Sequence, residues 1–135
     1  MNFIDKAFDN NLRGDDFLQA MADIYSESEV RKILDKYPQF VKDVILIIDY
    51  DYEIQMEGFD NVIYGHWEEK LPDLLHALDN CGASYEADVL RQAKAMTLEE
   101  YDENYDVLCD KLAIHNDYEG FWDLVRSYID TSLNL

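Results

Sequence analysis

The spacing of apolar side chains is the feature of this sequence that most restricts its fold. Along most of the chain these side chains recur every three or four residues, which is the period of one face of an α-helix. Only five glycines and two prolines interrupt the 135 residues, so the helical segments are separated by short turns and not by long loops. The length corresponds to one ordinary domain. The sequence therefore predicts a single all-α, bundle-like domain over residues 1–135.

Helix start and stop signals divide the pattern into six to eight helices. Ser26 and Glu29 have capping-box spacing, as do Thr97 and Glu100, and a proline such as Pro38 suits the first position of a helix. The expected helices cover residues 15–25, 26–37, 38–52, 67–81, 84–94, 97–112 and 117–129.

Residues 48–54 are ambiguous in this scheme. Apolar or aromatic residues alternate there with acidic ones, and strict alternation is equally typical of a half-buried strand. No other segment offers an obvious partner strand, so a helix is the preferred interpretation.

The excess of acidic residues excludes several classes of function. Thirty Asp and Glu stand against eleven Lys and Arg, which gives a formal net charge of −19. Direct nucleic-acid binding and docking on anionic membranes both need cationic side chains, so neither is expected. The longest aliphatic run, Val44 to Ile48, has five residues, whereas a membrane-spanning helix needs about 20. We expect a cytoplasmic protein.

The negative charge is concentrated in the last two thirds of the chain. Residues 1–48 carry nine acidic and six basic residues. Residues 49–82 carry nine acidic residues and one basic residue, Lys70, and residues 83–135 carry twelve acidic and four basic residues. Two stretches that contain many acids and no base are candidates for binding a basic partner. Their carboxylates are Asp49, Asp51, Glu53, Glu57, Asp60, Glu68 and Glu69 in the first stretch, and Glu99, Glu100, Asp102, Glu103, Asp106 and Asp110 in the second.

The second stretch places several carboxylates on one face of a helix. Steps of three and four residues correspond to about 4.5–6 Å along the helix axis, which is of the same order as the 3.4 Å between phosphates along one strand of duplex DNA. Like charges at this spacing weaken a helix slightly, so a function for them is a reasonable hypothesis. A face that serves only solubility is the alternative.

Residue patterns for catalysis or metal binding are absent from the sequence. The series Asp49-x-Asp51-x-Glu53 begins like a calcium loop, but Ile54 stands where such a loop has glycine and Asp60 where it has glutamate. The three histidines have no ligand-like spacing, and neither a glycine-rich phosphate loop nor a nucleophile motif occurs. We therefore expect no metal, no cofactor and no enzymatic activity.

The order of features in the second half of the chain resembles a known family. The features are a glycine-aromatic turn with a short aromatic stretch (57–64), a leucine-rich helix (67–82), an alanine-containing helix (83–95), an acidic segment (99–106) and a helix with Phe121-Trp122. In this order they resemble the bacterial DNA-mimic protein family over about residues 40–130.

The resemblance implies an acidic all-helical protein, as a homodimer, whose carboxylates imitate DNA phosphates. Such a protein would bind the DNA-binding face of a transcriptional regulator and block its access to DNA. Two other hypotheses remain open. One is an immunity or inhibitor protein that neutralises a basic nuclease, and the other is a solubilised helical domain with an unrelated partner.

Overall fold

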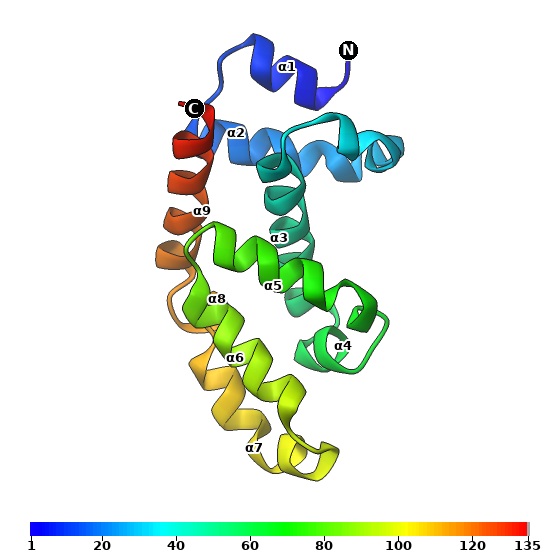
Figure 1. Cartoon of the computed structure of the whole chain (residues 1–135), viewed down its shortest axis with the longest axis vertical. Coiled ribbons are helices and arrows are strands. Elements are labelled where there is room, and N and C mark those ends of the chain that lie inside the picture. Colours follow the sequence, from blue (N-terminus) through cyan, green and yellow to red (C-terminus); the bar gives the residue numbers. More distant parts are fainter. Residues whose placement is uncertain (135) are drawn as a thin grey trace.

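The structure, a computed structural model, describes residues 1–134 and contains only helices and turns in that range (Figure 1). The predicted all-α fold is confirmed. The α-helices are α1 (Phe3–Asp9), α2 (Gly14–Met21), α3 (Gln39–Met56), α4 (Phe59–Ile63), α5 (Leu71–Asn80), α6 (Ser84–Ala95), α7 (Leu98–Lys111), α8 (Ala113–Asn116) and α9 (Tyr118–Leu133). Three 3-10 helices accompany them: η1 (Ala22–Tyr25), η2 (Ser28–Lys36) and η3 (Glu68–Lys70).

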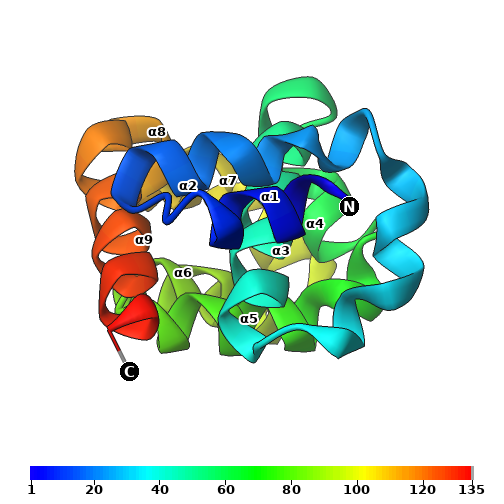
Figure 2. The same ribbon diagram turned by 90° about the horizontal axis from the view of Figure 1, so that it is seen from above.

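Helix α3 is the centre of the fold. It packs against α2, α4, α5 and α9, and α1 and α2 lie across the end of the molecule that carries both termini (Figures 1 and 2). The ambiguous segment 48–54 belongs to α3, as preferred. Its side chains Tyr50 and Ile54 are buried, because helices pack on several sides of α3, whereas Tyr52 in the same segment is 54% exposed.

The N-terminal segment differs from the expectation in two places. Residues 28–36 form the 3-10 helix η2 instead of an α-helix, and the capping box of Ser26 and Glu29 is not made. The reason is that Ser26 ends the preceding η1, where its N–H donates to the carbonyl of Asp23. Helix α1 was not expected, although Asn2 and Asp5 form a capping box at its start.

The later helix starts follow the sequence signals. The amide of Glu100 donates to the hydroxyl of Thr97 at 3.1 Å, and the amide of Thr97 donates to the carboxylate of Glu100 at 2.9 Å, so the predicted capping box is confirmed. Asp117 caps α9 by accepting from the amide of Gly120, and Pro72 lies in the first turn of α5. These contacts fix where α7 and α9 begin.

Helices α6 and α7 form the end of the molecule opposite the termini (Figure 1). Helix α7 packs mainly on α6 and α8, which leaves one side of it free of neighbouring helices. Trp67 and Trp122 are buried in the core, as their positions in apolar stripes predict. No helix within residues 1–134 combines the length and the apolar character needed to cross a bilayer.

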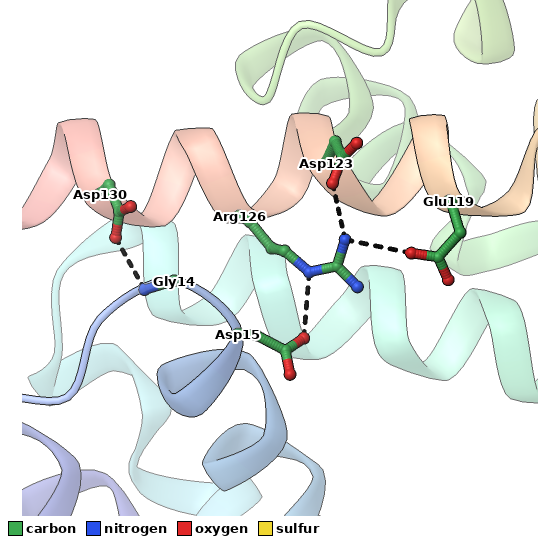
Figure 3. A network of polar contacts seen from close by, with 6 residues as sticks. All are labelled: Gly14, Asp15, Glu119, Asp123, Arg126 and Asp130. Atoms are coloured by element: carbon green, nitrogen blue, oxygen red, sulfur yellow. Dashed lines mark hydrogen bonds and ion pairs between the residues drawn. The ribbon is translucent and has the colours of Figure 1, made fainter.

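A charged junction joins α2 to α9 near the termini (Figure 3). The guanidinium of Arg126 contacts the carboxylates of Asp15 at 3.0 Å, Asp123 at 2.8 Å and Glu119 at 3.6 Å. About one turn further along α9, Asp130 accepts from the amide of Gly14 at 2.7 Å. These contacts hold the start of α2 against α9, although the residues that meet are more than one hundred positions apart in the chain.

Replacing Arg126 by methionine is expected to lower the free energy of unfolding by about 0.5–1 kcal/mol. Methionine keeps an apolar stem but leaves the facing carboxylates uncompensated, and their exposure to solvent limits the effect. Denaturant unfolding measures it, with Lys32→Met as the matched control, because Lys32 is exposed. A difference that persists unchanged at high salt would contradict an ion-pair origin.

Candidate partner-binding surface

The outer face of α7 carries a row of exposed carboxylates. At 3.6 residues per turn they occupy an arc of about 100° on the helix. Within the described residues, no lysine, arginine or histidine nitrogen lies at ion-pair distance from any of them. The row consists of Glu99, Asp102, Glu103, Asp106 and Asp110. Together these carboxylates form a continuous negative strip on the outer face of α7.

The opposite face of α7 fixes the orientation of this row. Tyr101 and Leu108 are buried, and the Tyr101 ring packs on the rings of Phe59 at 5.9 Å and Tyr64 at 5.0 Å between centroids. Because these contacts determine which side of α7 turns inward, the carboxylates must face solvent.

A carboxylate from the first acidic stretch joins the α7 row. Asp60 lies at the start of α4 and accepts a hydrogen bond of 2.6 Å from the hydroxyl of Tyr101. Burial raises the pKa of Cys109, and the negative charges of Asp106 and Asp60 raise it further, so both carboxylates act on the same thiol. We call Asp60 and the five carboxylates of the α7 row the α7 surface.

Two residues assigned to the acidic surface from sequence are buried. Asp49 is 8% exposed, and its carboxylate accepts hydrogen bonds from Nη1 and Nη2 of Arg31, at 2.7 and 2.9 Å. Glu53 is 7% exposed, and one of its oxygens lies 3.2 Å from His66. The prediction that these two carboxylates contribute to a partner-binding surface is therefore wrong, because both face the neighbouring elements of α3 and not solvent.

The other predicted carboxylates are exposed or partly exposed but lie in different settings. Glu68 forms an ion pair of 2.6 Å with Lys94, and Glu100 is engaged in the capping box of α7. Asp51 is partly exposed and accepts from the hydroxyl of Tyr118 at 2.7 Å. Glu57 and Glu69 are exposed. The structure thus distinguishes the two stretches, since the second presents its carboxylates together and the first disperses them.

The fold creates a second acidic group that sequence reasoning missed. Asp15, Glu119 and Asp123 surround Arg126 (Figure 3), and a cavity of about 300 Å³ beside them is lined by Glu119, Arg126 and Asp51. Asp15 belongs to the part of the chain with ordinary charge, so no local signal could have placed it next to α9. Arg126 neutralises part of this group, unlike the α7 surface.

Tyrosine hydroxyls hold several of the carboxylates in place. Six of them donate to Asp or Glu, and this was not foreseen, although the sequence holds ten tyrosines and few bases. A hydroxyl donor orients a carboxylate without cancelling its charge. The pairs are Tyr25 with Asp49, Tyr37 with Asp5, Tyr50 with Glu86, Tyr101 with Asp60, Tyr118 with Asp51 and Tyr128 with Asp43.

These contacts predict an unusual alkaline titration. Burial raises the pKa of seven tyrosines, and a carboxylate or thiol partner raises it further. The pKa of Tyr105 is raised to about 12. The pKa values in the folded protein lie above the unfolded pKa of 10.0. The stability that these tyrosines contribute is therefore complete below pH 10 and is lost as the pH rises through their folded pKa values. Ultraviolet absorbance should show these seven ionising at a higher pH in the folded protein than in the unfolded protein. Ionisation of any of these seven near pH 10 in the folded protein would contradict the contacts.

Glu86 is the most deeply buried carboxylate, at 1% exposure. It accepts from the hydroxyl of Tyr50 at 2.9 Å and from the backbone amides of Ala113 at 2.7 Å and Ile114 at 3.4 Å. Burial raises its pKa despite these hydrogen bonds, which act in the opposite direction. Glu86 thereby connects α6 to α3 and to the start of α8, directly behind the C-terminal end of α7.

Comparison with known proteins gives one family. The model of a family described as DMP19-like protein matches residues 35–131, more than two thirds of the chain. The match runs from the end of η2 into the last turns of α9 and includes all of α7. No curated protein and no solved structure matches the chain.

Proposed function

Because the chain belongs to the DMP19-like protein family, which is a DNA-mimic family, we propose that it binds the DNA-binding face of a DNA-binding protein, a transcriptional regulator, and blocks its access to DNA. The observation that carries this proposal is the α7 surface, whose carboxylates are exposed, lie close together and make no ion pair within the described residues. In this proposal the protein is an inhibitor without catalytic activity.

The geometry of α7 supports the role of a phosphate substitute. A helix with a buried inner face holds its carboxylates at about 4.5–6 Å intervals along the axis, so their positions are defined before a partner arrives. An unneutralised negative strip attracts a basic groove over a long range and speeds association. Since the contacts are ion pairs, the affinity falls steeply as salt increases.

Affinity capture tests this function. The immobilised protein is incubated with a lysate of its own source cells at low salt, and bound proteins are eluted in parallel with a salt gradient and with duplex DNA. We expect duplex DNA to release a DNA-binding regulator, whose binding to its own operator the purified protein then inhibits. Release of a nuclease would instead favour the inhibitor hypothesis, and retention of no basic protein would leave the acidic surface with solubility as its role.

A further inference from the structure

A carboxylate that imitates a phosphate must be both charged and fixed in position. A lysine or arginine partner fixes it but cancels its charge, whereas an unpartnered side chain keeps its charge and rotates freely. A neutral donor satisfies both requirements, because a hydroxyl orients the carboxylate and leaves the charge available.

At the α7 surface, Asp60 is held by a neutral donor of this kind. Helix α4 places Asp60 beside α7, where its side chain is exposed and accepts a hydrogen bond of 2.6 Å from the Tyr101 hydroxyl. Tyr101 is itself immobilised, because it is 1% exposed and its ring packs against the rings of Phe59, Tyr64 and Tyr105. Burial and the bond to Asp60 raise the pKa of Tyr101, so the hydroxyl keeps its proton.

We infer that Tyr101 is a positioning residue of the α7 surface, which holds the Asp60 carboxylate in place for a basic helix of the partner. This inference rests on the proposed function, since it assigns a role within the same contact surface. Tyr101 acts through Asp60 and does not itself touch the partner.

The test replaces Tyr101 by phenylalanine, which removes the hydroxyl and keeps the ring. Its matched control is Tyr118→Phe, which frees Asp51 in the same way but away from the α7 surface. The probe is a synthetic helical peptide with arginine at every third or fourth position, a simple substitute for a DNA-recognition helix. Its affinity is measured by fluorescence anisotropy, and the order of the Asp60 side chain by NMR scalar couplings in the free protein.

We expect Tyr101→Phe to disorder the Asp60 side chain and to weaken peptide binding by about 2- to 10-fold, the range associated with ordering one side chain at an interface. Tyr118→Phe leaves the affinity unchanged. In an Asp60→Asn background Tyr101→Phe has no further effect, which a general loss of structure would not produce.

Two results overturn the inference. One is an Asp60 side chain that stays equally ordered in Tyr101→Phe, and the other is an equal loss of affinity with and without Asp60. If the unaltered protein does not bind the peptide, the proposed contact surface fails, and the couplings of Asp60 still decide whether Tyr101 positions it.

Discussion

Reversing Glu99, Glu103 and Asp106 to lysine together is expected to abolish capture of the basic partner. The three side chains belong to the α7 surface, and lysines there would meet the cations of the partner. Juxtaposed like charges cost several kcal/mol, which corresponds to a loss of affinity of about 100-fold or more. Helix α7 should persist, because its buried residues Tyr101 and Leu108 are unchanged. Capture from lysate and circular dichroism measure the two effects.

The matched control replaces three acidic residues outside the α7 surface by lysine. Asp9, Asp23 and Glu29 are exposed and lie before the segment that matches the family. Three changes of two charges each take the formal net charge from −19 to −13 in both variants, so the bulk charge is equal. If the control loses capture as completely as the α7 variant, recognition depends on overall charge and not on this surface.

Replacing Glu86 by alanine is expected to have the largest effect on stability. The buried hydroxyl of Tyr50 and the amide of Ala113 would lose their acceptor, and each unsatisfied buried group costs about 1–3 kcal/mol. We expect unfolding to become easier by about 3 kcal/mol or more, with a melting temperature lower by roughly 10 °C. Thermal denaturation followed by circular dichroism measures this loss.

A graded comparison isolates the role of Glu86. Tyr50→Phe removes one donor and leaves the carboxylate on the amides, so it should cost about 1 kcal/mol, and Glu103→Ala on the exposed face should cost little. A loss no larger for Glu86→Ala than for Glu103→Ala would mean that the buried donors find other acceptors.

The pH dependence of Glu86 has a defined sign. Its pKa is raised by burial from an ordinary value of 4.5, so protonation favours the folded state. The contribution is complete below pH 4.5 and is lost as pH rises through the folded pKa. The stability advantage of the native protein over Glu86→Gln should therefore be larger in acid than at neutral pH.

The row of carboxylates on α7 could be predicted from the sequence because its determinants are local, whereas Asp60 joins it only through the tertiary contact with Tyr101. A capping box marks the start of the helix, and apolar spacing identifies its inner face, so the outer carboxylates follow. Asp49 and Glu53 could not be placed in the same way. Alternation with apolar residues suggests exposure, but helices pack on several sides of α3, and the partner of Asp49 is Arg31 from a different element.

Competition between neighbouring segments explains the error at Ser26. Its side chain and that of Glu29 have the spacing of a cap, but the backbone of Ser26 is already used to end η1, and only the three-dimensional course of the chain decides between the two uses. The charged junction at Arg126 was invisible for a similar reason, since Asp15 and Glu119 meet only after folding.

The tyrosine–carboxylate pairs separate the response of the fold to salt from the response of the interface. Ions screen the attraction between opposite charges but scarcely affect a bond from a neutral hydroxyl. Salt also reduces repulsion within a chain of formal charge −19. A concentration of salt that releases a basic partner should therefore leave the protein folded and somewhat more stable, so that it can be recovered and reused after each dissociation.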